Sequence, residues 1–330
     1  MVRRGVWRGL GSVVVAGAVA TTVVLGNGGA GNRPSATGKP RAVEAPAAAP
    51  GPALAPADES CHPKESYRPQ GALPQPGRMP ADTTMAAIVK RGRLIAGVDQ
   101  NSYLFGYRNP LTGQLDGYEI ELLREISTAL FGSPDRIEFR TITSAQRIPV
   151  LTDPTDPVDI VIDSMTINCD RWQHVAFSSD YMDAGQRVLV PRTSTAKSID
   201  DLGGKRVCAA GGTTSIQTLE DIKTHPVIPV AVKDWTDCLM LMQLGKVDAV
   251  STDDTILIGL QAQDPNTKLI GPRFTAEPHG IAMQPDQIDF VRFVNGVLER
   301  MRQDGSLLKL GQKWLGDSPM FRPPTAEYRD

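Results

Sequence analysis

Several side chains that could bind a small anion follow one short apolar run near the middle of the chain. The run Val158–Ile162 is rich in β-branched residues, which is typical of a buried strand, and Ser164, Thr166, Asn168 and Arg171 come after it. Ligands bind at the carboxyl ends of strands in an open α/β sheet. Hydroxyl and amide groups beside a guanidinium fork suit a carboxylate. An ordinary strand followed by a capped helix has the same pattern, so this stretch alone leaves both interpretations open.

A second candidate is the glycine-rich turn Gly211–Ser215, which lies between a predicted strand and a predicted helix. Gly212 and Thr213 lie where the helix begins, and the free N–H groups and dipole of a helix N-terminus favour an anion. The turn is not a nucleotide-binding loop, because no Gly-Lys-Ser/Thr sequence follows it. Turn formation alone would also explain these residue types.

Strands and helices alternate over most of the chain, and the alternation restarts after Ile162. It predicts two α/β units with parallel sheets and right-handed crossovers, the second inserted into the first. Apolar residues at helical spacing predict two final helices, over 286–303 and 306–314. The expected strands are 94–98, 137–141, 158–162, 187–191, 205–209, 227–232 and 247–251, and the earlier helices are 85–91, 117–130, 147–151, 215–223, 234–245 and 255–263.

The N-terminus reads as an export signal. Arg3, Arg4 and Arg8 precede the apolar run Leu10–Leu25, and small residues follow to Ala30. The run is short for a membrane-spanning helix, which needs about 20 apolar residues, so residues 1–30 are either a cleaved signal or an N-terminal anchor. Residues 31–83 are rich in Ala, Pro and Gly, and we expect a flexible tether there.

Composition excludes several classes of protein. A net charge of −2 over 330 residues argues against nucleic-acid binding. Four cysteines behind an export signal favour two disulfides. The chain has no C-x-x-C sequence and its four histidines are scattered, so we expect no metal and no cofactor.

Eight segments, in this order, resemble solute-binding protein family 3, the polar amino-acid-binding proteins of ABC importers. They are LIAGVD, LDGYEIEL, SAQR, VDIVIDSMTINCDR, FSSDYMDAGQRVLV, DLGGKRVCAAGGTTS, GKVDAVSTDD and DGSLLKLGQKWLG. SAQR, CDR and WTDC are most similar to the glutamate/glutamine-binding proteins of high-GC Gram-positive bacteria. The resemblance implies a bilobed, periplasmic-binding-protein-like (type II) fold, in which two doubly wound α/β lobes are joined by two crossover strands.

The resemblance also implies where the lobes divide. Lobe 1 would comprise residues 84–185 and 281–316, and lobe 2 residues 186–280. Crossovers would lie near 185–189 and 276–280, and residues 317–330 would form a C-terminal tail.

Carried over by position, the family's site assigns the groups that all amino acids share. Arg171 and Thr166 would hold the α-carboxylate, with the backbone of Ser164 facing the ligand. Asp253 would bind the α-ammonium. Either Asp253 or Asp254 could instead cap the helix that begins at Thr255, and we favour Asp253 for the ligand and Asp254 for the cap.

Other positions would contact the side chain of the ligand. Arg147 would select an acidic group, although it could also donate to an amide or face solvent on a short helix. Asp99 matches a polar position of the site. Phe105 and Tyr181 are either apolar walls or core residues. Where glutamine binders often have a basic residue before the glycine-rich turn, this chain has Ala210.

The resemblance suggests the cysteine pairing and the function. Cys208 and Cys238 match a disulfide of the high-GC branch, which leaves Cys61 with Cys169. We expect a monomer that captures glutamate or glutamine, with aspartate as a further candidate, and presents it to an importer permease without performing chemistry. A sensory receptor for a membrane signalling protein and a prephenate-type dehydratase on the same fold are the alternatives.

Overall fold

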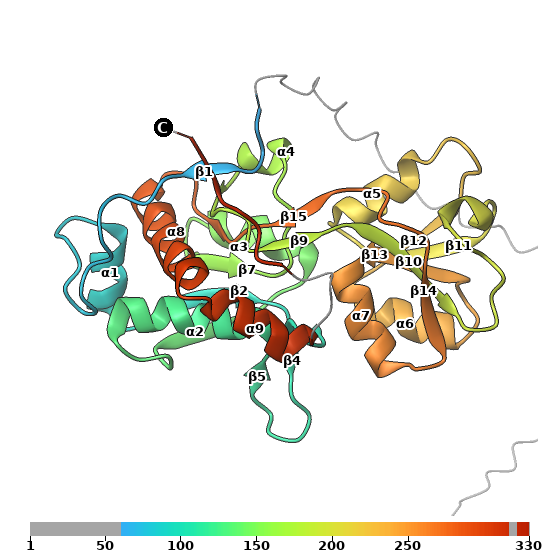
Figure 1. Ribbon diagram of the computed structural model, residues 1–330, viewed down its shortest axis with the longest axis horizontal. Coiled ribbons are helices and arrows are strands. Elements are labelled where there is room, and N and C mark those ends of the chain that lie inside the picture. The colour runs from blue at the N-terminus through green and yellow to red at the C-terminus, as the bar shows by residue number, and fades with distance from the viewer. Residues whose placement is uncertain (1–60, 317–321, 330) are drawn as a thin grey trace, which may run out of the picture. The chain divides into compact units, whose positions relative to one another are not determined.

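The computed structural model describes residues 61–316 and 322–329, and it contains two five-stranded sheets (Figure 1). The first sheet has the order β6-β2-β7-β16-β8, with β2 parallel to β6 and β7. Strand β16 enters this sheet after the whole second unit, which confirms that the second unit is inserted into the first. The strands are β2 (Leu94–Val98), β6 (Ile137–Thr141), β7 (Ile160–Ile162), β8 (Ala176–Phe177) and β16 (Ala282–Met283).

Apolar residues on both sides of β2 explain why helices cover both faces of this sheet. Leu94, Ala96 and Val98 belong to one buried cluster with four helices, whereas Ile95 belongs to another with α3. A strand that is buried on both faces shows a continuous apolar run, as LIAGV does. The four helices are α1 (Thr84–Arg91), α2 (Tyr118–Phe131), α8 (Ile288–Gln303) and α9 (Ser306–Leu315), and α3 spans Arg147–Thr152 after the 3₁₀ turn η1 (Ser144–Gln146).

The second sheet repeats this construction with the order β12-β11-β13-β10-β14. Cys208 and Ala210 of β11 pack with α6 and α7, and Val207 and Ala209 pack with α5 on the opposite face. The strands are β10 (Gln186–Pro191), β11 (Arg206–Ala210), β12 (Ile228–Val232), β13 (Ala249–Asp253) and β14 (Thr267–Ile270). The helices are α5 (Thr214–Asp221), α6 (Trp235–Gln243) and α7 (Asp254–Gln263), and the 3₁₀ turn η2 spans Ile199–Leu202.

The chain passes from one sheet to the other, and back, through a two-stranded antiparallel ribbon. It pairs β9 (Met182–Ala184) with β15 (Glu277–His279), so that Met182 is opposite His279. The expected second crossover coincides with β15. Residues 186–189, which we expected in the first crossover, instead pair with β13 inside the second sheet, and the ribbon strand comes a few residues earlier.

Short strands form a hairpin after β2. The order is β3 (Asn101–Ser102), β4 (Gly106–Arg108) and β5 (Leu115–Asp116), and the turn expected over 109–113 connects the last two. Leu111 at its tip is 93% exposed.

The expectation of a flexible tether over 31–83 is wrong for its last part. Strand β1 (Glu65–Tyr67) pairs in parallel with β17 (Glu327–Arg329), which lies in the expected C-terminal tail. Ser66 is fully buried, and Asn295 of α8 donates to Ser66 Oγ (2.8 Å) and to the carbonyl of Tyr67 (2.7 Å). Polar contacts with α8 therefore hold this segment on lobe 1, together with Tyr67, Leu73 and Met79, which pack against the main apolar cluster.

The remaining N-terminal expectations lie outside the described residues. These are the signal or anchor over 1–30 and the tether up to residue 60. Within the part of the chain that the structure describes, no helix has the length and apolar character needed to cross a membrane. Helix α4 (Cys169–Trp172), which carries Arg171, completes the described helices.

Candidate functional site

The site lies where the strand order of each sheet reverses. In the first sheet the chain passes from β2 to β6 on one side and then to β7 on the other. Open α/β sheets bind ligands at such a point, outside the carboxyl ends of the strands. Val98 is paired with Ile162, so the next residues, Asp99 and Asp163, follow neighbouring strand ends.

The second sheet has an equivalent reversal at β11, between β12 and β13. Gly212 and Thr213 follow the end of β11, and Asp253 is the last residue of β13. Both halves of the predicted site therefore occupy the positions where the topology favours a ligand.

Arg171 is buried and forms no ion pair with a described side chain, although the carboxylates of Glu277, Asp253 and Asp163 act on its charge from a greater distance. One guanidinium nitrogen, Nη1, donates to the carbonyl of Thr166 (2.7 Å), and the other, Nη2, is 3.5 Å from the carbonyl of Gly212. No ion pair joins it to a carboxylate of the described residues. Burial, and to a lesser extent Arg147, lower the pKa of Arg171 to about 9, so it still carries its charge at neutral pH.

Arg147 is 2% exposed, which contradicts the alternative of a solvent-facing arginine. Its Nε donates to the carbonyl of Ser144 (2.9 Å), and Nη1 donates to the carbonyls of Asp163 (2.9 Å) and Ser164 (3.3 Å). Backbone carbonyls of lobe 1 thus fix its guanidinium in place.

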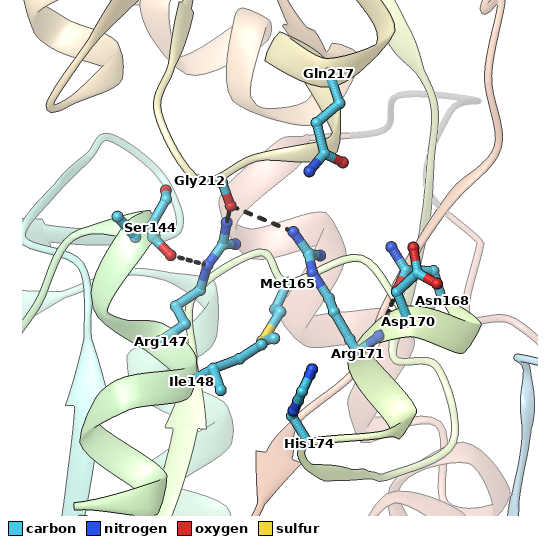
Figure 2. Close-up of a pocket in the computed structure, with 11 residues that line it drawn as sticks. Ser144, Arg147, Ile148, Met165, Asn168, Asp170, Arg171, His174, Gly212 and Gln217 are labelled. Carbon is cyan, nitrogen blue, oxygen red and sulfur yellow. Dashed lines mark hydrogen bonds between the residues drawn. The ribbon is translucent and has the colours of Figure 1, made fainter. Parts of the chain in front are cut away.

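The two guanidinium groups converge on one carbonyl of lobe 2 (Figure 2). Arg147 Nη2 is 3.3 Å from the carbonyl oxygen of Gly212, the same atom that Arg171 approaches. A pocket of about 310 Å³ surrounds them, with Met165, His174 and Gln217 among its lining residues. This volume suits a small ligand such as a free amino acid, but Asp99, Thr166 and Asp253 are not among its lining residues.

Gly212 has a φ of +76°, and a Cβ atom there would lie 2.6 Å from Cα of Ala145 in lobe 1. Only glycine permits this approach of the two lobes. Thr213 caps the N-terminus of α5, as expected if the turn is only structural. Its Oγ1 accepts from the N–H of Ile216 (3.2 Å) and donates to the carbonyl of Ala210 (2.7 Å).

Asp253 pairs with a residue that the sequence did not indicate. Its Oδ2 lies 2.7 Å from Nε2 of His279, and both side chains are buried. The other oxygen, Oδ1, has no hydrogen-bond partner among the described groups. One oxygen of Asp253 is therefore held in position while the other is available for a donor.

Asp254 does not cap α7, contrary to our expectation. The helix begins at Asp254 itself, and the carboxylate of Asp254 binds Arg273 Nε (2.7 Å) and the N–H of Gly185 (3.3 Å). Asp253 makes no side-chain cap either. The second aspartate instead joins α7 to the segments that lead to and from the ribbon.

The hydroxyl of Thr166 donates a hydrogen bond to Glu277 of β15. Glu277, like His279, was not indicated by the sequence. Thr166 Oγ1 and Thr214 Oγ1, from different lobes, both donate to Glu277 Oε2 at 2.7 Å, and Thr275 donates to Oε1 at 2.7 Å. Glu277 is 3% exposed, so this cluster is a buried contact between the lobes beside the ribbon.

Two carboxylates at the end of the first sheet have oxygens that accept no hydrogen bond from the described groups. Asp99 Oδ1 accepts from the N–H groups of Gln100 (2.6 Å) and Asn101 (3.0 Å), and the hydroxyl of Ser102 is close enough to lower the pKa of the carboxyl, but no hydrogen bond from a described residue reaches Oδ2. Asp163 has none on either oxygen. Burial raises the pKa of Asp99 to about 6 and the pKa of Asp163 well above its usual range, although Arg147 opposes the shift of Asp163.

The remaining candidates are core residues or make their hydrogen bonds within lobe 1. Phe105 and Tyr181 are fully buried, and both belong to the main apolar cluster of lobe 1. Tyr181 donates its hydroxyl to Glu119 (2.5 Å). Ser164 has a φ of +42° and donates both its N–H (2.7 Å) and its hydroxyl (3.0 Å) to the same carboxylate. Glu119 thereby shapes the bend that follows β7.

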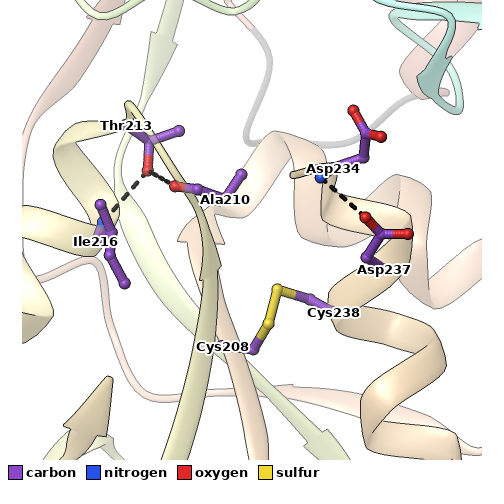
Figure 3. The surroundings of a disulfide bond; sticks show 7 residues. All are labelled: Cys208, Ala210, Thr213, Ile216, Asp234, Asp237 and Cys238. Carbon is purple, nitrogen blue, oxygen red and sulfur yellow. Dashed lines mark hydrogen bonds between the residues drawn. A yellow bond between two sulfur atoms is a disulfide. The ribbon is translucent and has the colours of Figure 1, made fainter. Parts of the chain in front are cut away.

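Both expected disulfides are present. Cys208 of β11 is bonded to Cys238 of α6, beneath the glycine-rich turn (Figure 3). Cys61 is bonded to Cys169, the first residue of the short helix that carries Arg171. By chain entropy, loops of 30 and 108 residues would stabilise the fold by roughly 4 and 5 kcal/mol. Among the described side chains, no group of three acidic, histidine or cysteine residues could hold a metal.

Comparison with known proteins agrees with this architecture. The family of bacterial extracellular solute-binding proteins, family 3, matches residues 94–317. The glutamine-binding protein GlnH of an ABC transporter of Bacillus subtilis is 32% identical over 237 residues, 72% of this chain and 86% of that protein. A glutamine-binding protein of Geobacillus stearothermophilus is 36% identical over 200 residues, 60% of this chain and 75% of that protein.

A solved structure shows the same bilobed arrangement. The P235GK mutant of ArgBP from T. maritima aligns with a TM-score of 0.65 and 28% identity, covering 71% of this chain and 99% of that protein. These relatives are binding proteins rather than enzymes, and they favour an amino-acid-binding receptor over a dehydratase or a sensory module. The chain belongs to the bacterial extracellular solute-binding proteins of family 3.

Proposed function

We propose that this protein is an extracytoplasmic receptor that encloses glutamine or glutamate between its two lobes and delivers it to an ABC importer, without catalysing a reaction. One observation carries the proposal: in the part of the chain that the structure describes, buried Arg171 of lobe 1 forms no ion pair, and buried Asp253 of lobe 2, whose charge acts on Arg171, has an oxygen without a hydrogen-bond partner. An amino acid would supply an anion for the arginine and a cation for the aspartate.

Arg171 would bind the α-carboxylate. A buried charge that lacks a partner is strongly unfavourable, and a carboxylate can accept two parallel N–H bonds from a guanidinium. The hydrogen bond from Nη1 to the carbonyl of Thr166 orients the group toward Gly212. Ligand binding would replace the weak contact at 3.5 Å with a charged pair.

Asp253 would bind the α-ammonium through Oδ1. His279 occupies Oδ2 at 2.7 Å, so the carboxylate cannot rotate freely. Because Asp253 lies in lobe 2 and Arg171 in lobe 1, a ligand held by both would join the lobes. The ribbon of β9 and β15 would act as the hinge of this closure.

The test is calorimetric titration of the full chain with glutamine and glutamate. Replacing a buried charged partner costs about 3 kcal/mol or more, so Arg171→Ala should weaken binding at least about 100-fold. Asp253→Asn should weaken binding similarly. Arg136→Ala, which removes an exposed arginine remote from the cleft, should leave the affinity unchanged. Unaltered binding in Arg171→Ala, or no binding of any amino acid by the unmodified protein, would refute the proposal.

A further inference from the structure

Helix α4, which carries Arg171, has only four residues. A single helical turn is not stable on its own, because its few hydrogen bonds do not offset the entropy of ordering it. Asn168 caps this turn by accepting a hydrogen bond from the N–H of Arg171 (2.9 Å). The orientation of the turn, and of the guanidinium on it, therefore depends on contacts with the rest of the protein.

A strap across lobe 1 lies against this turn. We call residues 61–67 and 327–329 the terminal strap, and strands β1 and β17 pair inside it (Figure 1). The Nζ of Lys64 joins its two halves to the core of lobe 1, because it lies 3.2 Å from Glu327 and 3.1 Å from buried Asp180. Both halves lie outside the residues that match the family, so the terminal strap is an addition to that fold.

The terminal strap holds both ends of α4. Cys169, the first residue of the helix, is bonded to Cys61. Trp172, the last residue, donates its indole N–H to the carbonyl of Pro63 (2.8 Å). Arg171 lies between these two attachments.

A third attachment comes from the other half of the strap, where the guanidinium of Arg329 lies over two aromatic rings. Its Cζ is 4.1 Å from the ring centroid of Trp172 and 4.7 Å from that of Tyr67. Its Nε is buried and has no hydrogen-bond partner among the described groups. A cation is attracted to the face of an aromatic ring, and the attraction grows where water is excluded. Arg329 thus attaches strand β17 to the last residue of α4.

The terminal strap has other contacts that keep it on lobe 1. Asn295 donates to Ser66 Oγ (2.8 Å) and to the carbonyl of Tyr67 (2.7 Å), and Ser66 Oγ donates to the carbonyl of Phe177 (2.7 Å). The attachments to α4 come in addition to these contacts. Their effect falls on the turn that carries Arg171.

We propose that the terminal strap positions Arg171 for the ligand, with Arg329 as a positioning residue that acts through Trp172. A guanidinium binds a carboxylate in a fixed planar geometry, and hydrogen bonds weaken steeply when their angles fall. A turn that is held at both ends presents this geometry before the ligand arrives, which reduces the cost of binding. The inference rests on the proposed function, because Arg329 touches the ligand nowhere and would act only on the residue that binds its α-carboxylate.

The experiment is calorimetric titration of the full chain, with both disulfides formed, at a temperature at which circular dichroism shows every variant to be folded. Arg329→Ala should weaken the binding of glutamine about ten-fold, and that of glutamate by the same factor, because both ligands have the α-carboxylate. Arg329→Lys keeps a cation that can lie over the rings and should recover most of the loss. A role in stability alone would change the melting temperature and leave these affinities unaltered.

Arg68→Ala is the matched control. The guanidinium of Arg68 also stacks on an aromatic ring, 5.1 Å from the centroid of Tyr328 in β17, but that ring does not belong to α4. This variant should leave both affinities unchanged. Adding Arg329→Ala to Arg171→Ala should cause no further loss of affinity, because the group that the strap positions is then absent.

Unchanged affinity in folded Arg329→Ala would overturn the inference, and so would a loss that Arg329→Lys does not recover or that Arg68→Ala shares. A further ten-fold loss on adding Arg329→Ala to Arg171→Ala would also overturn it. If Arg329→Ala does not fold, the double variant Cys61→Ser, Cys169→Ser removes another attachment and should weaken both ligands equally. In all these cases Arg171→Ala still tests the proposed function, which fails only if that variant binds normally or if the unmodified protein binds no amino acid.

Discussion

Asp99 is a buried carboxylate that lowers the stability of the fold at neutral pH. One oxygen accepts two backbone N–H bonds, yet burial still raises the pKa of the carboxyl to about 6, with the charge of Asp234 adding to the effect. The folded state therefore binds a proton more readily than the unfolded chain does. At neutral pH the ionised carboxylate destabilises the unliganded protein.

Asp99→Asn should therefore stabilise the unliganded protein at pH 7.5. A pKa near 6, against 3.8 for an ordinary aspartate, corresponds to roughly 3 kcal/mol of unfolding free energy. The protonated carboxyl of Asp99 stabilises the folded state relative to the ionised one. This stabilisation is fully present below about pH 4 and is lost as the pH rises through 6. The difference in unfolding free energy between variant and parent, measured by urea denaturation, should accordingly shrink between pH 7.5 and pH 5.

Asp135→Asn is the control, because its carboxylate is exposed and it should show no such pH dependence. Equal stability of Asp99→Asn and the unmodified protein at pH 7.5 would contradict the burial argument. If the difference in unfolding free energy between Asp99→Asn and the unmodified protein grew as the pH fell, the predicted direction of the pH dependence would be wrong.

Residue types indicated Thr166 and Arg171, and the family resemblance indicated Asp253, but the partners of Thr166 and Asp253 were not predicted. Thr166, Arg171 and Asp253 follow apolar runs, and the structure places them at the reversal points of the sheets. Glu277 and His279 were missed because their partners are far away in sequence: Thr166 is 111 residues from Glu277, and Asp253 is 26 from His279. Only the ribbon brings them together.

The unsatisfied oxygens of Asp163 were not predicted, for a different reason. A single acidic residue after a buried strand looks like an ordinary strand end, and nothing in the sequence shows that its oxygens find no donor. A register argument could have indicated it, because Asp99 and Asp163 both follow apolar runs that were expected to be parallel strands. The neighbour relation of these strands required the sheet order.

At the scale of elements, apolar runs predicted the sheets well, and composition predicted the N-terminal segment badly. LIAGV and the strand over 137–141 have the expected bounds, and the helix over 147–152 is one residue longer than expected. Residues 61–83 contain few apolar side chains, yet a disulfide and polar contacts with α8 order them. Low apolar content indicates disorder only where no other element supplies the contacts.

Asn295 of α8 is the centre of these contacts. Its amide donates to Ser66 Oγ and to the carbonyl of Tyr67, and its Oδ1 accepts from the N–H of Ser179 at 2.7 Å. Because truncation leaves buried polar groups without partners, Asn295→Ala should lower the free energy of unfolding by roughly 2–3 kcal/mol. Chemical denaturation measures this loss.

Asn266→Ala is the matched control, since Asn266 is exposed in the loop before β14. A change of equal size in both variants would mean that β1 does not depend on Asn295. Protection of the Ser66 and Tyr67 amides from hydrogen exchange should fall in Asn295→Ala alone.

At the scale of the whole molecule, the cluster around Glu277 joins the two lobes. Hydroxyl groups of Thr166 and Thr214, one from each lobe, share a single carboxylate oxygen. Glu277→Ala removes this shared acceptor, so the unliganded protein should shift toward an open arrangement. Small-angle scattering should show a larger radius of gyration without ligand and a normal one at saturating glutamine.

Glu220→Ala, an exposed change on α5, should leave the radius unchanged. An identical radius for Glu277→Ala and the unmodified protein would show that other contacts determine closure. The glutamine affinity of Glu277→Ala should fall by about ten-fold, because closure then depends more on the ligand.

The bond between Cys61 and Cys169 also has a mechanical consequence. A pull applied to the chain before Cys61 passes through the disulfide directly into α4, next to Arg171, and bypasses everything between the two cysteines. The 108-residue loop cannot extend while the bond is intact. In a stretching experiment the measured contour length would therefore be roughly 370 Å shorter than for the reduced protein. Along the covalent path, tension on the N-terminal side would therefore act on α4, the helix that carries Arg171, and would bypass β1 and the sheet strands β2, β6 and β7.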